Sequence, residues 1–242
     1  MAENHTVLAR PPLKSFVLQV YFPNNLVIGE SRSRFYESIK ERFPNIAVPQ
    51  YATPTESAMS QAAMECNFLA IDGSEGIRVA LNSFTYGTGR HEMFSKSSDA
   101  FEALFKDFTA KYSIRIATGY KIAYGNIVTK ESVQIVGEAF ADFFTVGGVP
   151  TIKERLVHFD GSLNYTVDNS LLTVAFKPDP QHLAGMQDFR YEIGLTRNNV
   201  SVPIQNGNLS ELHSIFFASH NYIKQLFLGI LTPKYTAYVK GG

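Results

Sequence analysis

Residues 208–232 have the sequence NLSELHSIFFASHNYIKQLFLGILT and carry the clearest helical pattern in the chain. Asn208 is a favourable N-cap, and Glu211 three residues later can bond back to its amide in a capping box. Pro233 follows the stretch and stops further turns, because proline lacks the amide hydrogen that a helix needs. Apolar residues recur between these limits at steps of three and four: Leu209, Leu212, Phe216, Ile223, Leu226, Phe227 and Ile230. The stretch therefore predicts a long amphipathic helix with one face buried in a core.

The composition of the 242 residues is typical of a folded globular protein. Hydrophobic residues make up 45% and charged residues 18%, and 22 basic residues balance 22 acidic ones. This charge balance disfavours a nucleic-acid partner. No apolar run reaches the roughly 20 residues of a membrane-spanning helix, and the first residues lack the pattern of a signal peptide. We therefore expect a cytoplasmic protein without a membrane span.

Residues 1–128 predict the element order β-α-β-β-α-β, as in a ferredoxin-like fold. In chain order the patterns predict a strand over 13–22, a helix from Ser31 to Pro44, hairpin strands over 67–71 and 76–84, a helix over 97–112 capped by Ser97, and a strand over 114–124. The last strand has a side of mostly small residues, among them Gly119 and Ala123, and we expect a helix to pack there. Residues 44–65 hold three prolines and predict a surface loop, whose role the sequence does not give.

Residues 129–242 continue with more hairpin patterns. They predict a helix over 133–146, hairpin strands over 156–167 and 171–176, a strand over 189–195 and the closing helix. Because hairpins dominate the whole chain, we expect an α+β fold with antiparallel sheets and helices layered on one face. The two halves, 1–128 and 129–242, are expected to pack intimately as one unit that shares the strand over 114–124.

A glycine-containing segment is the candidate binding site. Gly87, Gly89, Arg90 and His91 follow a predicted strand and precede the helix that begins near Ser97. Glycine amides, a guanidinium and an imidazole can together cradle a phosphate group. The spacing matches neither the dinucleotide-binding fingerprint nor a P-loop, and no lysine–hydroxyl pair is present to meet a nucleotide and magnesium. A plain turn is the favoured interpretation, and a phosphate site is the alternative.

No set of residues typical of catalysis or metal binding emerges. His213 and His220 lie seven residues apart on the closing helix, which separates them by roughly 10 Å, too far for one metal ion. We interpret each as a structural histidine, and Cys66, the single cysteine, as a buried thiol. The chain has no Gly-x-Ser-x-Gly elbow, and His158 with Asp160 on one strand face is more typical of a solvated surface. We predict no catalytic residue, no metal ligand and no cofactor.

Several short motifs occur in order along the chain. They are Pro11-Pro12-Leu13 leading into VLQVYF at 17–22, Arg42-Phe43-Pro44, Tyr124-Gly125-Asn126, and then His220, Phe227 and Thr232. Together they resemble a sporadically distributed family of uncharacterised bacterial proteins of similar length. The chain departs from that family at Ala123, where the family tends to carry arginine, and in having no tryptophan. The resemblance implies that Tyr124, Asn126, His220, Phe227 and Thr232 form a structural motif. It also implies a bacterial gene on a mobile-element or antiviral defence locus, and no particular activity.

The sequence is therefore interpreted as a non-catalytic binding, sensor or assembly protein that binds a protein partner or a second copy of itself. Phe217 and Leu228 lie on the closing helix outside its main stripe and form a second apolar edge. Either the helix over 133–146 or the same helix of a second subunit can cover this edge, and the second arrangement is a homodimer. The alternative function is an enzyme or ligand-binding protein that uses residues 87–91 on a phosphorylated small molecule.

Overall fold

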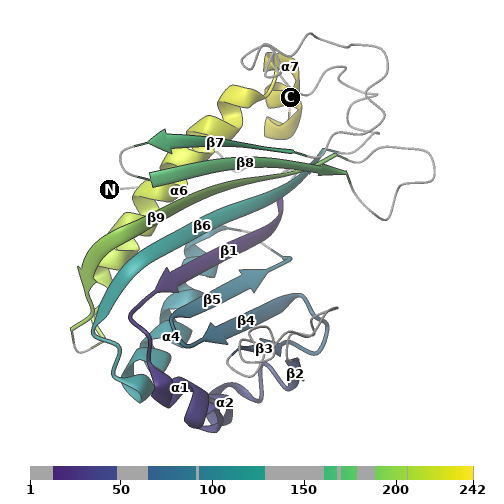
Figure 1. The fold of residues 1–242 in the computed structure, drawn as a ribbon. Helices are drawn as coiled ribbons and strands as arrows, with labels where there is room; N and C mark the ends of the chain where they lie inside the picture. The colour runs from purple at the N-terminus through teal and green to yellow at the C-terminus, as the bar shows by residue number, and fades with distance from the viewer. Residues whose placement is uncertain are drawn as a thin grey trace.

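The computed structural model describes residues 13–47, 65–90, 93–128, 161–167, 170–178, 189–205 and 207–241. These residues form one nine-stranded sheet with the strand order β2-β3-β4-β5-β1-β6-β9-β8-β7 (Figure 1). The strands are β1 (Leu13–Tyr21), β2 (Asn45–Ala47), β3 (Cys66–Leu69), β4 (Glu75–Ala80), β5 (Ser83–Thr88), β6 (Ile116–Val128), β7 (Gly161–Val167), β8 (Ser170–Pro178) and β9 (Phe189–Pro203). Every neighbouring pair is antiparallel. The predicted α+β class and antiparallel pairing are therefore confirmed.

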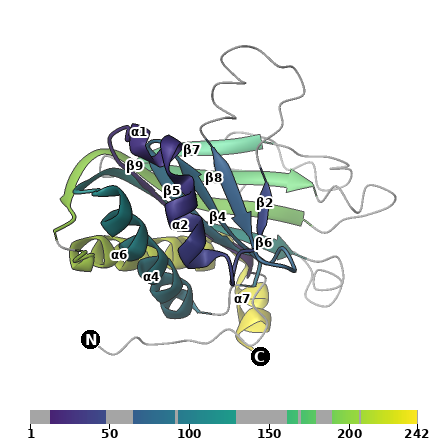
Figure 2. The same ribbon diagram turned by 90° about the horizontal axis from the view of Figure 1, so that it is seen from below.

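The helices of the described residues pack against this sheet and against each other. They are α1 (Leu26–Glu30), α2 (Arg32–Ile39), α4 (Phe94–Tyr112), α6 (Ser210–Ile230) and α7 (Pro233–Lys240). Helix α4 contacts β1 and β5, and α6 contacts β6 and β9; both helices lie behind the sheet in Figure 1. Seen from below, α2 lies beside α4, with which it makes contact (Figure 2). None of the described helices is long and apolar enough to cross a membrane.

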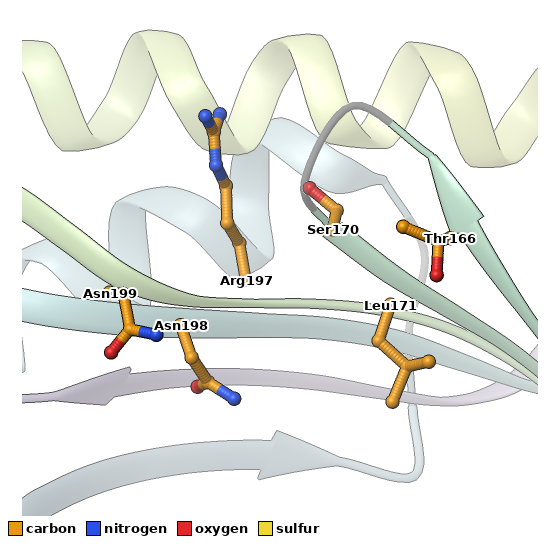
Figure 3. Close-up of a pocket in the computed structure, with 6 residues that line it drawn as sticks. All are labelled: Thr166, Ser170, Leu171, Arg197, Asn198 and Asn199. Carbon is orange, nitrogen blue, oxygen red and sulfur yellow. The ribbon is translucent and has the colours of Figure 1, made fainter.

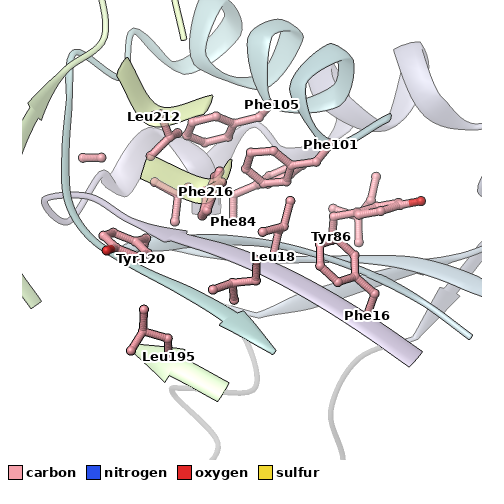
Figure 4. Close-up of a cluster of buried hydrophobic side chains, with 14 of the residues drawn as sticks. Phe16, Leu18, Phe84, Tyr86, Phe101, Phe105, Tyr120, Leu195, Leu212 and Phe216 are labelled. Atoms are coloured by element: carbon pink, nitrogen blue, oxygen red, sulfur yellow. The ribbon is translucent and has the colours of Figure 1, made fainter. Parts of the chain in front are cut away.

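The core between these helices and the sheet is rich in aromatic side chains. Phe84 of β5 contacts Phe105 and Phe108 of α4, with ring centroids 5.3 and 4.9 Å apart. Phe101 of α4 meets Phe216 of α6 at 5.5 Å and so joins the two helices (Figure 4). Ring pairs of this kind each contribute about 0.5–1.5 kcal/mol beyond the burial of their area. The apolar stripe predicted for the closing helix lies mainly in this core, as do Phe101, Phe105 and Phe108 of α4.

Strand β6 turns its large side chains toward the helices. Tyr120, Ile122 and Tyr124 are buried, and the ring of Tyr120 meets that of Phe216 at 5.8 Å. Helix α6 thus packs on the large side of the strand, rather than on the mostly small side where a helix was predicted. The physical reason is that large apolar groups remove more surface from water than alanine or glycine does.

The element order of the first half differs from the predicted β-α-β-β-α-β. It is β-α-α-β-β-β-β-α-β, in part because residues 76–84 form two strands instead of one. The chain reverses at Leu81 and Asn82, and Ala80 pairs with Ser83 across this turn. Apolar residues continue up to the turn, so the hydrophobic pattern conceals the reversal.

The helix starts also differ from the predicted caps. Helix α6 begins at Ser210, and the side chain of Asn208 accepts a bond from the Ser210 amide at 3.0 Å without being the N-cap. Helix α4 begins at Phe94, so Ser97 is a buried residue within its first turn. Ser31 does precede α2, but its side chain makes no capping bond. Local sequence therefore located the helices better than it located their first residues.

Several predicted segments have different limits or lie outside the described residues. Strands β7 and β8 form the predicted hairpin, and β9 runs to Pro203, well past the predicted end at Leu195. Strand β2 falls within the predicted loop of 44–65. The predicted helix over 133–146, residues 48–64 of the loop and residues 156–160 of the first hairpin strand are outside the described residues.

Candidate functional site

The backbone of the candidate phosphate loop is bonded within the protein. Gly87 belongs to β5, so the predicted loop is shorter than the sequence suggested. The amide of Gly89 donates to the carbonyl oxygen of Ser74 at 2.7 Å. An anion at this position would therefore compete with an existing bond for that amide. His91 lies outside the described residues.

The side chain of Arg90 in the same loop has a partner of its own. Its Nη1 lies 3.1 Å from Oδ2 of Asp72, which sits in the turn between β3 and β4. The amide of Arg90 donates to Oγ1 of Thr88 at 3.0 Å. Hydrogen bonds from the amide and hydroxyl of Ser74 hold the pKa of Asp72 below its usual value, so Asp72 stays ionised beside the guanidinium. These contacts join two turns and are those of a structural loop.

The structure brings Tyr124 of β6 and His220 of α6 together. The Tyr124 hydroxyl lies 2.6 Å from Nδ1 of His220, and the ring of Phe94 stacks on the imidazole with centroids 4.4 Å apart. Burial raises the pKa of Tyr124 well above its ordinary value. The phenol therefore keeps its proton, and it shares a hydrogen bond with Nδ1 of His220 whose direction depends on the tautomer of the imidazole. The sequence indicated a structural role for His220 but did not identify this side-chain bond.

The other residues of the predicted structural motif lie on β6, on α6 and at the start of α7. Asn126 is buried two residues further along β6, and its Nδ2 donates to the carbonyl oxygen of Tyr124 at 3.3 Å. Phe227 is buried on α6. Thr232 caps α7 by accepting a bond from the Tyr235 amide at 3.1 Å. Each of these contacts stabilises the fold, and none of them presents a group poised for chemistry.

The remaining candidate side chains are also structural. Nδ1 of His213 lies within hydrogen-bond distance of Oε1 of Glu102, and this contact links α6 to α4. Cys66 is buried, and burial raises the pKa of its thiol and so disfavours the reactive thiolate. Within the described ranges, no group of three histidine, cysteine, aspartate or glutamate residues is arranged to hold a metal ion.

A polar pocket of about 430 Å³ lies where β9 continues past the beginning of β8. Its lining residues are Thr166, Ser170, Leu171, Arg197, Asn198 and Asn199 (Figure 3). Arg197 extends toward the neighbouring helix, whereas Asn198 and Leu171 point to the opposite side of the sheet. Because the lining side chains do not converge on one point, the pocket lacks the geometry that orients a small ligand. No sequence motif marked this pocket.

The outer edge of β7 is the feature best suited to binding. Strand β7 ends the sheet on one side, and β2 ends it on the other. No strand among the described residues pairs with the outer edge of β7. Asn164 and Thr166 are exposed, and Tyr165 is 39% exposed. On the inner side, Thr173 of β8 donates from Oγ1 to Oδ1 of Asn164 at 2.8 Å. The sequence predicted this strand but gave no sign that it is an edge.

A scan against models of known protein families found no match, and a search of curated proteins found none either. Membership of the uncharacterised bacterial family therefore stays a prediction.

Proposed function

We propose that the protein is a non-catalytic binding and assembly module that accepts an extended strand at the outer edge of β7. The observation that carries this proposal is the character of that edge. Strand β7 has seven residues, GSLNYTV, none of them charged and none of them proline. Its register with β8 runs without a bulge from Gly161 to Val167.

Natural proteins protect exposed sheet edges with charges, prolines, bulges or very short strands. The opposite edge of this sheet follows the rule, because β2 has only three residues. Strand β7 uses none of these devices. In an antiparallel ladder every second residue directs both its N–H and its C=O away from the neighbouring strand. The outer edge therefore presents a row of backbone donors and acceptors to which an added strand can bond.

The chemistry of the edge favours a protein segment as the partner. The chain carries 22 basic and 22 acidic residues, and the strand itself is uncharged, so neither supplies attraction for a polyanion. Tyr165 adds an exposed aromatic ring, a residue type that is enriched at protein interfaces. The resemblance to uncharacterised bacterial proteins supports a sensor or assembly role at a defence or mobile-element locus.

Affinity capture with a matched pair of variants tests this function. Asn164→Lys places a charge on the edge strand, and Thr173→Lys places the same charge at the paired position one strand inward. Both variants remove the same Asn164–Thr173 hydrogen bond. A partner captured by the wild-type chain, then purified, should bind the wild type and Thr173→Lys but not Asn164→Lys. Hydrogen–deuterium exchange should show new protection in residues 161–167 of the complex. Equal binding to all three chains would exclude β7 as the binding edge.

A further inference from the structure

We infer that the strand added to β7 is β7 of a second copy of this chain, related to the first by a two-fold axis that lies between the two copies of Asn164. The inference rests on the proposed function, since it names the occupant of the same edge. Every strand pair in the sheet is antiparallel. A two-fold axis perpendicular to the sheet pairs two identical strands antiparallel, so the dimer continues the existing pattern.

Asn164 marks the axis because it is the midpoint of Gly161–Val167. An axis there pairs all seven residues of one strand with all seven of the other. Thr166 then lies opposite the second copy's Ser162. Any other axis position leaves residues of the strand unpaired. The position with the most backbone hydrogen bonds is therefore the one centred on Asn164.

The side chain on the axis suits self-pairing. A two-fold axis places the central residue opposite its own copy, so a charged residue there would face a like charge. Asn164 is neutral, and its Oδ1 accepts from Thr173 within the chain. Its Nδ2 has no acceptor among the described residues and can donate across the axis. The second copy returns the same bond, because the contact is isologous.

The face of β7 that carries Tyr165 also favours a second copy. Tyr165 pairs in register with Leu172 of β8, so both side chains are on one face. Leu172 and Val174 on that face are buried, whereas Tyr165 is 39% exposed at the end of the layer. A strand added at the edge extends the layer past Tyr165 and covers the ring. Two copies of the ring are covered at once.

The second apolar edge of α6, the other candidate for a dimer contact, is partly covered within the chain. Phe217 and Leu228 are only partly exposed and pack against the core. The ring of Phe217 meets that of Phe94 with centroids 6.3 Å apart. Less apolar surface therefore remains on α6 for a partner than its sequence indicated, which favours β7 as the contact between copies.

The oligomeric state of the full chain tests the inference. By light scattering at high micromolar concentration, the wild type and Thr173→Lys should be dimers. Asn164→Lys should be a monomer with the circular dichroism spectrum and thermal stability of Thr173→Lys. A monomeric wild type overturns the inference, as does a folded Asn164→Lys that remains dimeric. A monomeric wild type whose purified partner is still lost in Asn164→Lys leaves the proposed function standing.

Oxidative cross-linking locates the axis independently. Residues opposite each other in antiparallel strands have Cα atoms about 4.5–5.5 Å apart, within the range that a disulfide spans. Asn164→Cys should therefore form a linked dimer under mild copper-catalysed air oxidation, which takes one electron from each thiol. Thr173→Cys places the two thiols roughly 14 Å apart, three strand spacings, and should not link. The native Cys66 is buried and gives little background. Equal linking of both variants, or none in Asn164→Cys, overturns the assigned axis.

Discussion

The hydroxyl of Tyr124 lies 2.6 Å from Nδ1 of His220 and joins β6, in the middle of the sheet, to helix α6. We expect Tyr124→Phe to lower the free energy of unfolding by about 1–3 kcal/mol, because the half-buried imidazole loses its hydrogen bond to the phenol. Chemical denaturation at neutral pH measures the change.

Tyr21→Phe is the matched control for this prediction. Tyr21 donates from its hydroxyl to Oε1 of Gln19 at 3.1 Å, within one strand and between two partly exposed side chains. Loss of this hydrogen bond should change the free energy of unfolding by less than about 0.5 kcal/mol, as is usual for surface substitutions. Equal effects in the two variants would show that the contact between Tyr124 and His220 contributes no more to the free energy of unfolding than the exposed hydrogen bond of Tyr21.

Because the pKa of the Tyr86 phenol is raised in the folded protein, we expect the protein to lose stability at high pH. Burial, and then the negative charge of Glu75, raise its pKa in the folded protein to about 12, from an ordinary value of 10.0. Between these values the unfolded chain releases the proton while the folded chain keeps it. The free energy of unfolding should therefore fall by up to about 1.4 kcal/mol per pH unit from this group as pH rises. Below pH 10 the contribution is fully present.

Denaturation of wild type and Tyr86→Phe across pH 9 to about pH 12 tests this assignment. The variant should lose part of the alkaline decline, and the remainder belongs to other groups such as Tyr112 and Tyr124, whose pKa values are also raised by burial. An unchanged decline would mean that Tyr86 ionises as readily in the folded chain as in the unfolded one.

The sequence was sufficient to predict helices α2, α4 and α6 because their signal is local, whereas the short helices α1 and α7 were not predicted. Phe101, Phe105 and Phe108 recur at helical spacing and are buried on α4 as expected. Strand neighbours were not predictable in this way, since pairing joins distant residues. Periodicity alone does not indicate that Phe16 lies between Thr88 and Tyr124 in the sheet.

The same limit applies to the sites. The resemblance singled out Tyr124 and His220, but only the fold shows that residues 96 positions apart share a hydrogen bond. The edge position of β7 depends on which strand pairs with β8, and no property of GSLNYTV itself determines that. The loop at Gly89 and Arg90 was predictable as a turn, whereas its internal partners Ser74 and Asp72 were not.

The close approach of β9 to Gly119 of β6 leaves no room for a side chain at this position. A Cβ there would lie 2.9 Å from the carbonyl oxygen of Arg197 and 3.1 Å from Oδ1 of Asn198. The first of these is backbone in the paired strand β9 and cannot move without disturbing the ladder. Gly119→Ala should therefore destabilise by about 1–3 kcal/mol. Thermal and chemical denaturation measure the loss.

Gly229 provides the control for this substitution. It lies on α6, and a Cβ added to it meets nothing within 4 Å. Gly229→Ala should stabilise by about 0.5–1 kcal/mol, because alanine loses less backbone entropy in a helix. The two substitutions should thus have opposite signs, and destabilisation of similar size in both would contradict the close approach at Gly119.

We expect the loop at Gly89 and Arg90 to bind no phosphorylated ligand specifically. Its amide and guanidinium already bond to Ser74 and Asp72, so an anion must replace contacts rather than fill an empty cradle. A thermal-shift panel of nucleotides and sugar phosphates should therefore leave the wild-type melting temperature unchanged. Asp72→Asn removes the charge that holds Arg90. The guanidinium is then released for an anion, so this variant is the more sensitive test of binding. If Asp72→Asn also shows no shift, the loop is a turn. A saturable shift in the wild type that disappears in Arg90→Ala would instead support the ligand-binding alternative.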